Sequence, residues 1–363
     1  MVTHEYFMQQ ALNLARLSEV QTRPNPQVGA LIVKNDQIVG IGTHLFAGGS
    51  HAEIFALQQA GELARGATLY LTLEPCAHYG KTPPCANAVV KAGISRVFIA
   101  NLDPNPLVKG KGVEILRAAE IEVIIGLCSD EATSLNQVFF HNIQTKTPFI
   151  TVKAGLSLDG RIATKDNLSQ WITSVESRKD AHQYRVTHEA ILVGINTLLT
   201  DDPSLTPHLV ENPIRKPIRI ILDRQLRTPL ASKVILDGKA PTWICTSNAD
   251  SELHAIYQHY GVKIIYLPDL NIPDLLKRLY QEQIYSLLVE GGEQIYSSFL
   301  DVGAVNQLVC YYSPQLIGSK LAKHLFAGIG FGDLQSNLQF KISETKQLGN
   351  DIKIVSQIIR GQI

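Results

Sequence analysis

The stretch that decides the fold reads His51-Ala52-Glu53, then a β-rich ATLYLTL at residues 67–73, then EPCAHYGKTPPC at residues 74–85. It supplies one imidazole, from His51, and two thiols, from Cys76 and Cys85. Three protein ligands leave the fourth corner of a tetrahedral zinc open to water, whereas structural zincs are closed by four ligands. The stretch therefore predicts a catalytic zinc on these three side chains, with Glu53 as the acid–base group that the water needs.

The spacing within this stretch indicates a hydrolytic deaminase, with one departure. His-x-Glu followed by Pro-Cys-x-x-Cys is the signature of zinc nucleobase deaminases. Here eight residues separate the two cysteines instead of two. Pro84 suits the first turn of a helix, so Cys85 and His51 are expected near positive helix ends, which favour the thiolate that a metal requires. The alternatives are a structural zinc, or two free cysteines beside a surface histidine.

Length and composition indicate two globular domains and no polyanionic partner. The chain has 363 residues, 45% hydrophobic and 18% charged, which fits two domains that each bury a core. Its 33 acidic and 33 basic residues balance, which argues against a nucleic-acid partner. We expect no membrane span and no signal peptide. The five cysteines, at positions 76, 85, 128, 245 and 310, form no even framework, so a reducing cytoplasmic location is expected.

Hydrophobic periodicity predicts alternating helices and strands in the first half. Helices are expected over about residues 3–18, 51–64 and 130–141, and strands over 28–34, 38–42, 67–73, 96–100 and 121–125. Such alternation implies an α/β sandwich with helices on both faces of a sheet. A polar stretch ending at Pro148 marks the boundary, which gives domains of 1–145 and 146–363.

The second half carries a second chemical signal at the junction of a strand and a helix. A capping box, Thr173 with Glu176, is expected to open a helix that ends near His188. Further on, a predicted strand at residues 286–290 ends in Glu290, and Gly291-Gly292 lies between it and a predicted helix. Glycines at such a point let backbone N–H groups approach a phosphate at the positive end of the helix. The Gly-x-Gly-x-x-Gly fingerprint is not present here, so a Rossmann domain is not indicated.

Motifs in both halves resemble those of the bifunctional riboflavin-biosynthesis deaminase/reductases. In the first half these are PNPxVG at 24–29, HAE at 51–53 and PCxHxGxTPPC at 75–85, and the eight-residue cysteine spacing is that family's own. In the second half they are VKAxLSxDG at 152–160, SQWIT at 169–173, GxxTxxxDDP at 194–203 and EGG at 290–292. The resemblance implies an α/β protein: an N-terminal cytidine-deaminase-like α/β/α sandwich and a C-terminal dihydrofolate-reductase-like α/β domain that uses NADPH.

For the first half, the resemblance implies zinc on His51, Cys76 and Cys85, and Glu53 as the proton donor. It also implies substrate contacts from Asn25, His44, His78 and Lys81. A phosphorylated substrate gives His44 and Lys81 a physical role, because cations in the pocket loops can hold its phosphate. The alternative for each of the four is an ordinary loop residue.

For the second half, the resemblance implies contacts with both cofactor and substrate. Cofactor contacts are expected from Gly155, Trp171, Thr173, Thr197 and Asp201, and from the helix start Gly292, Glu293, Gln294, Ile295, Tyr296, Ser297 and Ser298. Substrate contacts are expected from Ser169, Arg185, Leu205 and Glu290, and His208 stands where some relatives have an arginine near the substrate phosphate. The alternatives are that Trp171 is a core anchor and Arg185 a solvated helix residue.

Three charged residues of this half have more specific expected roles. Arg224 follows the strand that ends in Asp223 and is expected beside the adenosine 2′-phosphate, which favours NADPH over NADH. Lys153 and Glu290 stand at strand ends and are candidates to orient or protonate the reacting sugar. The nicotinamide does the redox work, and the protein supplies positioning and charge.

These observations predict a bifunctional cytoplasmic enzyme of riboflavin synthesis with Zn²⁺ and NADPH as cofactors. The first domain would deaminate 2,5-diamino-6-(5-phosphoribosylamino)pyrimidin-4-one, and the second would reduce the ribosyl group of the resulting uracil to ribityl. We expect a small-molecule phosphorylated substrate, no nucleic acid, no membrane, and a homo-oligomer, dimer or tetramer. The alternatives are a nucleoside or tRNA deaminase with an unrelated C-terminal domain, and a non-catalytic zinc-stabilised nucleotide-binding protein.

Overall fold

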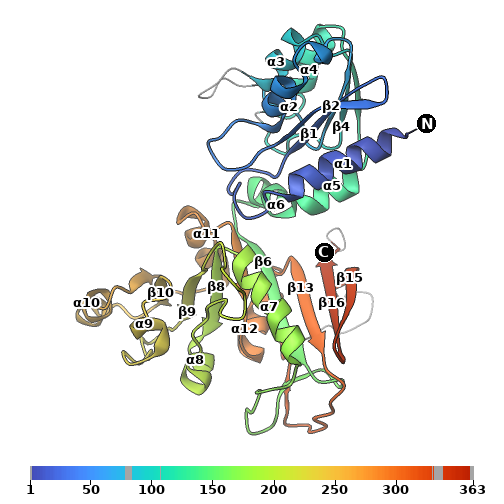
Figure 1. Ribbon diagram of the computed structural model, residues 1–363. Helices are drawn as coiled ribbons and strands as arrows, with labels where there is room; N and C mark the ends of the chain where they lie inside the picture. The colour runs from blue at the N-terminus through green and yellow to red at the C-terminus, as the bar shows by residue number, and fades with distance from the viewer. Residues whose placement is uncertain (1, 78–83, 107, 329, 331–337, 360–363) are drawn as a thin grey trace. The chain divides into compact units, whose positions relative to one another are not determined.

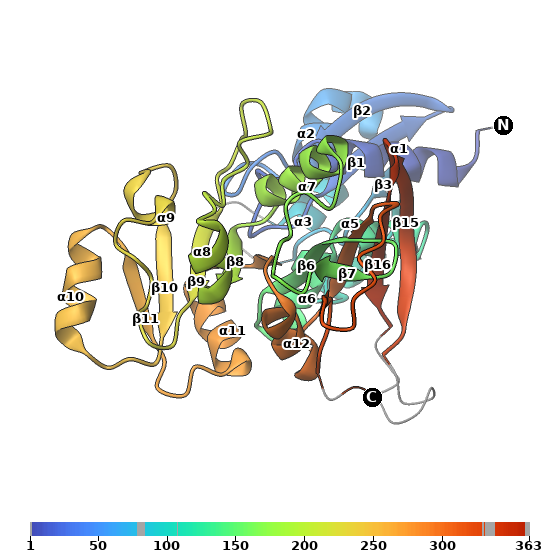
Figure 2. The same ribbon diagram turned by 90° about the horizontal axis from the view of Figure 1, so that it is seen from below.

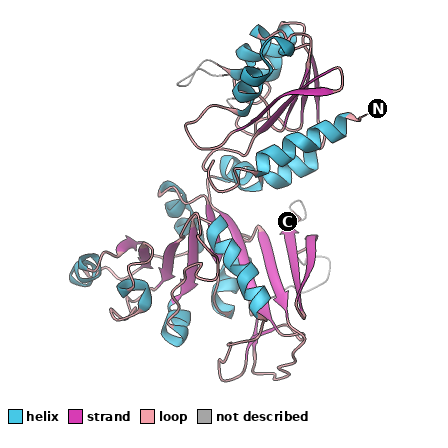
Figure 3. Ribbon diagram, in the orientation of Figure 1, coloured by secondary structure: helices cyan, strands magenta, loops and turns pink. Residues whose placement is uncertain are grey.

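The computed structural model describes residues 2–77, 84–106, 108–328, 330 and 338–359. The chain forms two compact units, Met1–Lys146 and Thr147–Ile363 (Figure 1). Each unit is a mixed α/β structure with a sheet of its own (Figure 3).

The first unit is built on a five-stranded sheet in the order β2-β1-β3-β4-β5. Its strands are β1 (Gly29–Lys34), β2 (Gln37–Thr43), β3 (Thr68–Leu71), β4 (Arg96–Ile99) and β5 (Glu122–Ile125). β1 pairs antiparallel with β2 and β3, and β3, β4 and β5 are parallel. The β1–β2 hairpin turns at Asn35 and Asp36, which both have positive φ, as the two-residue turn of a twisted hairpin requires.

Helices cover both faces of this sheet, as the sequence predicts. They are α1 (His4–Arg16), α2 (Ala52–Ala60) with the 3₁₀ turn η1 (Gly61–Ala64), α3 (Cys85–Lys91), α4 (Lys111–Ala118), α5 (Ser129–Leu135) and α6 (Gln137–Thr145). One core cluster joins α1 and α5 to one face, with Met8 and Leu12 against Leu31 and Tyr70. The other joins α2, α3 and α4 to the opposite face (Figure 1).

Two glycines of β2 set the position of α2, and so of His51. A Cβ on Gly42 would lie 2.0 Å from the carbonyl oxygen of Ala52, and a Cβ on Gly40 would lie 2.3 Å from that of Ala56. Real Cβ atoms do not come this close, so the helix lies directly on the strand because glycine stands at both positions. The first turn of α2 is thereby fixed against the sheet.

The expectation of a single helix over residues 130–141 is wrong. The structure has two helices, α5 and α6, separated at Asn136. The side chain of Asn136 accepts a hydrogen bond from the backbone N–H of Gln27 at 2.8 Å and donates one to the carbonyl oxygen of Gln27 at 2.8 Å. A contact between residues more than 100 positions apart interrupts the helix, and local periodicity carries no sign of it.

The second unit is built on a nine-stranded sheet in the order β11-β10-β9-β8-β12-β6-β13-β16-β15. Its strands are β6 (Phe149–Leu156), β8 (Ala190–Gly194), β9 (Ile218–Leu222), β10 (Thr242–Thr246), β11 (Lys263–Tyr266), β12 (Ser286–Val289), β13 (Gln307–Tyr312), β15 (Phe340–Leu348) and β16 (Asp351–Ile358). In this sheet order, neighbouring strands from β11 through to β13 all pair in parallel. The strands β16 and β15 add an antiparallel hairpin at one end of the sheet (Figure 2).

Helices pack on both faces of this sheet as well. They are α7 (Val175–Thr187), α8 (Ile195–Asp201), α9 (Lys233–Leu236), α10 (Ser251–His259), α11 (Ile272–Gln281) and α12 (Glu293–Asp301). The largest core cluster joins α11 and α12 to one face, and α8, α9 and α10 pack on the other. A short ladder, β7 (Arg161–Ala163) with β14 (Lys323–His324), lies outside the main sheet.

The start of α7 differs from the predicted capping box. The N-cap is Ser174 rather than Thr173, and the Ser174 hydroxyl accepts a hydrogen bond from the backbone N–H of Ser177. Asp351, from β16, accepts from the backbone N–H of Ser174 at 2.7 Å and from the Ser177 hydroxyl at 2.6 Å. A carboxylate distant in sequence thus supports the Ser174 cap, and the helix starts one residue later than the predicted capping box.

Candidate functional site

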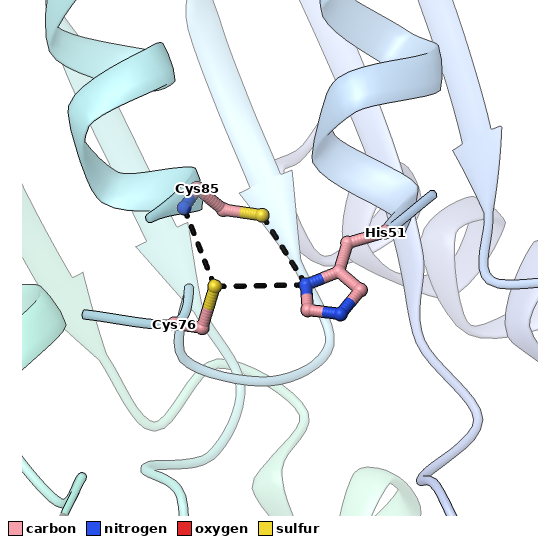
Figure 4. Close-up of side chains that lie close together, drawn as sticks. All are labelled: His51, Cys76 and Cys85. Carbon is pink, nitrogen blue, oxygen red and sulfur yellow. Dashed lines mark hydrogen bonds between the residues drawn. The ribbon is translucent and has the colours of Figure 1, made fainter. Parts of the chain in front are cut away.

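Three elements of the first unit bring His51, Cys76 and Cys85 together. His51 is the N-cap of α2, Cys85 is the first residue of α3, and Cys76 lies in the loop that follows β3. The Nδ1 atom of His51 lies 3.6 Å from the sulfur of Cys76 and 3.3 Å from that of Cys85 (Figure 4). Both sulfurs therefore face the same ring nitrogen.

These distances fit a tetrahedral zinc ion. Ligand atoms at about 2.0–2.3 Å from a central zinc stand about 3.5–3.8 Å from one another. The three ligand atoms all lie within 4.8 Å of one another, with no fourth His, Cys, Asp or Glu in the group among the described residues. One nitrogen and two sulfurs are donors that zinc prefers, and the fourth coordination position remains open for water or substrate.

Glu53 lies in the first turn of α2, next to this cluster. The residue is buried, with 3% of its surface exposed. Its Oε2 atom is buried and makes no hydrogen bond to any described residue. Burial raises the pKa of Glu53 to about 7. A buried carboxylate oxygen left open beside three metal ligands fits a site that is completed by an ion and its water.

The pKa values of the two thiols are shifted in opposite directions. The pKa of Cys76 is lowered to about 4, chiefly because its sulfur accepts a hydrogen bond from the Cys85 thiol. That same hydrogen bond, together with burial, raises the pKa of Cys85. The hydrogen bond to Cys76 also raises the pKa of His51. Because metal ligation requires thiolates and a neutral imidazole, metal binding at these three groups releases protons.

Two of the four expected substrate contacts of this unit lie beside the cluster. The Nδ2 atom of Asn25 is 3.1 Å from Nε2 of His44, and the His44 ring stands edge-on to that of His51 at 5.4 Å. Burial lowers the pKa of His44, so its imidazole is neutral at pH 7, which does not favour the expected role as a cation for phosphate. His78 and Lys81 lie outside the described residues.

Glu74 is a buried residue of this site that the sequence does not single out. Its Oε1 accepts hydrogen bonds from the backbone N–H groups of Gly112 and Val113, at 2.9 and 3.3 Å. Its Oε2 accepts from those of Asp103 and Gly110, at 3.1 and 3.0 Å. The carboxylate thus ties the peptide that leads to Cys76 to the N-terminus of α4, where a negative charge is favourable. Its signal in the sequence is only its place two residues before a cysteine.

In the second unit, the half-buried Lys153 and Arg185 form an ion cluster with the buried Glu290. The Nζ atom of Lys153 lies 2.9 Å from Oε2 of Glu290, and Arg185 reaches both carboxylate oxygens, at 2.9 and 3.0 Å. Burial alone would raise the pKa of Glu290, but the charges and hydrogen bonds of Arg185 and Lys153 hold it well below its usual range. Glu290 is therefore ionised at neutral pH. Arg185 is a half-buried ion-pair partner of Glu290, not a solvated helix residue.

The loop after α8 reaches the same cluster. Arg185 donates to the carbonyl oxygen of Thr206 at 2.9 Å, and His182 accepts from the backbone N–H of Leu209 at 3.2 Å. His208 is exposed, with its ring edge-on to that of His182 at 4.6 Å. Leu205 has a positive φ, and its side chain is buried in a hydrophobic core cluster.

A cavity of about 920 Å³ lies beside the Gly291-Gly292 junction. Tyr296 holds this junction: its hydroxyl accepts from the backbone N–H of Gly291 and donates to the carbonyl oxygen of Lys153 at 2.8 Å. Gly291 has a φ of +144°, which favours glycine. The expected cofactor residues that line the cavity are Thr197, Asp201, Arg224, Gly292, Glu293, Gln294, Ile295 and Ser298, joined by the expected substrate residue Ser169.

The remaining expected cofactor residues do not line this cavity. Tyr296 and Ser297 are buried, because a helix cannot present seven consecutive side chains to one cavity. Trp171 is 65% exposed with the guanidinium of Arg178 over its ring at 4.1 Å, so it is not a core anchor. Gly155 lies against Thr173, whose methyl group would be 3.1 Å from a Cβ at that position. The lining also includes Gln225, Arg227, Asn271 and Lys323, which the sequence does not single out.

The residues around the cavity fit a dinucleotide phosphate. The first turn of α12 lies at its wall with Gly292 as the N-cap, and a Cβ on Gly292 would meet no atom within 4 Å. Backbone N–H groups there can face a pyrophosphate. Two arginines and one lysine also line the cavity and supply charge for further phosphate.

The folds and sites of the two units define a class of protein: a zinc-dependent deaminase domain joined to a nucleotide-dependent reductase domain. Two family models match the chain. The cytidine and deoxycytidylate deaminase zinc-binding region matches residues 1–101, and the RibD C-terminal domain matches residues 148–354.

Curated relatives and solved structures match over nearly the whole length. The riboflavin biosynthesis protein RibD of Bacillus amyloliquefaciens is 46% identical over 97% of this chain and 95% of its own, and that of Aquifex aeolicus is 44% identical over 96% of each. A structure of Acinetobacter baumannii RibD is 41% identical, with a TM-score of 0.86 over 98% of this chain and 99% of its own. The chain belongs to the RibD family, the bifunctional deaminase/reductases of riboflavin biosynthesis.

Membership establishes the two reactions and their cofactors. The protein deaminates 2,5-diamino-6-(5-phosphoribosylamino)pyrimidin-4(3H)-one by zinc-dependent hydrolysis and reduces the ribosyl group of the product with NADPH. Its substrate is a small molecule. The two alternative functions drawn from the sequence are therefore not supported. None of the helices in the described parts of the chain is long and apolar enough to cross a membrane.

Glu74→Gln should loosen the zinc site. In the variant, an NH₂ group replaces one carboxylate oxygen, faces backbone N–H donors and cannot accept from them, so about half of the hydrogen bonds are lost. We expect the free energy of unfolding of the first unit to fall by about 2–4 kcal/mol. Zinc release to a chelator should be faster, and hydrogen exchange in α4 should rise. The control is Glu114→Gln, the same change at an exposed position of α4. Equal zinc release by the two variants would show that Glu74 does not anchor the site.

Proposed function

We propose that residues 1–145 carry out the deamination and residues 146–363 the reduction, with the side chains assigned below. Support comes from the separate clusters in the two compact units. The observation that carries the first assignment is the convergence of one ring nitrogen and two sulfurs beside the open carboxylate oxygen of Glu53.

In the first unit, His51, Cys76 and Cys85 would hold the zinc. Zinc bound there would supply Lewis-acid activation of the attacking water at neutral pH. Glu53 takes the proton that the water loses on attack and delivers it to the amine that leaves. Its freedom from other hydrogen bonds supports this role, because its Oε2 atom has no competing partner among the described residues.

The same unit binds the pyrimidine through nearby polar groups. Asn25 and His44, hydrogen-bonded to each other and next to His51, are suited to contact the ring rather than the phosphate, because His44 is buried and neutral. His78 and Lys81 are proposed as further contacts on the family pattern. Lys81 is the cation of this set and is assigned to the substrate phosphate.

In the second unit, Lys153 is proposed as the proton donor and Glu290 as the group that orients it. NADPH supplies the hydride when it is bound. Reduction at the sugar carbon also requires a proton on the ring oxygen when the carbon–oxygen bond opens. Glu290 is ionised by its two cationic neighbours, so it has no proton to give, whereas the Lys153 ammonium does. Arg185 then holds Glu290 in place from the other side.

The other proposed contacts follow the cavity and its surroundings. Ser169, Leu205 and His208 are assigned to the substrate. The cofactor is assigned to Gly155, Trp171, Thr173, Thr197, Asp201, Arg224 and the run Gly292 to Ser298. Of these, Tyr296 and Ser297 act by holding the helix start, and Arg224 acts by holding the turn after β9 at the cavity wall.

We also propose that the chain works as a homo-oligomer in the cytoplasm. The edge strand β15 is exposed along nearly its whole length, which leaves a sheet edge available for a second chain. The two thiol ligands require a reducing compartment. Light scattering of the purified chain tests the first point: a monomeric mass at working concentration would contradict it.

Glu53→Gln should abolish ammonia release while zinc stays bound. Loss of the proton shuttle is expected to slow deamination by about 10²–10⁴-fold, and the metal content is unchanged because Glu53 is not a ligand. NADPH-dependent reduction of the deaminated intermediate should remain normal. Glu62→Gln, an exposed change in η1, is the control. Normal ammonia release by Glu53→Gln would refute the role of this carboxylate.

Lys153→Met should slow the reduction and leave the deamination unchanged. Removing the proton donor is expected to slow reduction by about 10²-fold or more. Deamination should be unaffected, and the affinity for NADPH should stay within about threefold, since Glu290 keeps its pair with Arg185. NADPH absorbance and ammonia are measured in the same assay, with Lys341→Met on exposed β15 as the control. Reduction at the wild-type rate would exclude Lys153 as the donor.

A further inference from the structure

A short turn after β9, residues 223–228, carries two arginines to the wall of the reductase cavity. The turn is fixed from within, because Asp223 accepts hydrogen bonds from the backbone N–H and the hydroxyl of Thr228, at 2.7 and 2.8 Å. The hydroxyl of Tyr257 lies 2.6 Å from the carbonyl oxygen of Thr228 and 3.1 Å from that of Leu226. Leu226 is buried in the core with a positive φ.

This internal fixing leaves the other side chains of the turn facing outward. Arg224, Gln225 and Arg227 are exposed, and all three line the cavity. The turn therefore presents two positive charges from a backbone that is held before any ligand arrives. Such preorganisation reduces the entropy that is lost when an anion binds.

The two arginines differ in how far their guanidinium groups are already engaged. Both terminal nitrogens of Arg224 donate to backbone carbonyls, to Asp269 at 3.1 Å and to Leu270 at 2.9 Å. These bonds tie the turn to the segment that leads into α11. Arg227 makes one hydrogen bond to a described residue, from Nη2 to the side chain of Asn196 at 3.2 Å. Most of the donors of Arg227 remain available to a ligand.

The place of the turn in the sheet indicates which part of the cofactor it meets. β9 lies beside β8 (Figure 2), and β8 separates it from β12 in the sheet. The reacting nicotinamide has to lie near Lys153 and Glu290, at β6 and the end of β12, and the N-terminus of α12 is suited to the pyrophosphate. The adenosine end of the dinucleotide then reaches the cavity wall formed by residues 222–227 and Asn271.

We infer that Arg227 binds the adenosine 2′-phosphate and distinguishes NADPH from NADH, while Arg224 is a positioning residue that holds the turn. This inference rests on the assignment of the cavity to the cofactor. NADPH and NADH differ only by that phosphate, a dianion for which the planar fork of an arginine is a matched partner. The acidic residues of the cavity lining, Asp201 and Glu293, stand on α8 and α12 and not on the turn.

The test uses two nucleotides that differ only in the 2′-phosphate, adenosine 2′,5′-bisphosphate and adenosine 5′-monophosphate. Their affinities for the full-length chain are measured by titration calorimetry, with competition against NADPH. Arg227→Gln should weaken binding of the bisphosphate by about tenfold or more and that of the monophosphate by less than about twofold. The preference for NADPH over NADH should fall by the same factor. Arg227→Lys should recover part of the loss, because the charge stays and the fork is lost.

Two further variants separate discrimination from general effects. Arg224→Gln should weaken both nucleotides by similar factors, because it loosens the turn as a whole. Lys341→Gln removes an exposed positive charge outside the cavity and should change neither affinity. If Arg224→Gln selectively lost affinity for the bisphosphate, or if Arg227→Gln kept the wild-type preference for the bisphosphate, the inference about Arg227 would be wrong. The assignment of the cavity to the cofactor would still stand. If NADPH binds the wild type and neither nucleotide competes with it, the cavity is not the cofactor site and both assignments fall.

Discussion

The first unit depends on one constraint: a ring nitrogen and two sulfurs from three separate elements must stand within the reach of a single ion. The start of α2 and the loop after β3 are each held by contacts within the fold. Gly40 and Gly42 let α2 lie directly on β2. The Glu74 carboxylate ties the peptide before Cys76 to the start of α4 through four backbone N–H groups. These contacts hold two of the ligand-bearing segments in place.

The second unit depends on a different interaction, the pairing of the buried Glu290 carboxylate with two cations. A carboxylate in the interior is costly unless it is paired and hydrogen-bonded. Glu290 meets this condition with two cations at once, and the consequence is chemical as well as structural. The carboxylate is kept ionised and pairs with Lys153. The same arrangement fixes Arg185 and, through Thr206, the loop that carries Leu205 and His208.

Prediction from sequence succeeded where chemistry is tied to short spacing. The α/β alternation, the helices on both faces of the first sheet and the zinc donor set could all be anticipated, because period and spacing are local properties. Errors arose where a distant residue acts on a local pattern. Asn136 divides a predicted helix because its amide bonds to Gln27, and Asp351 moves the start of α7 to Ser174. Within the run Gly292 to Ser298, Tyr296 and Ser297 are buried and do not line the cavity, because one side of the helix faces the core.

By itself, the sequence determined the kind of chemistry in each half: a set of donors suited to zinc with a carboxylate close to it in the chain, and a strand followed by a glycine-rich helix start. Tertiary structure decided the state of those groups. It decided that Glu290 is ionised and His44 neutral, that Arg224 is committed to two carbonyls, and that Arg227 has donors to spare. The physical reason is that ionisation and hydrogen-bond occupancy depend on burial and on neighbours that are brought together only by folding, whereas residue type and spacing are written in the chain.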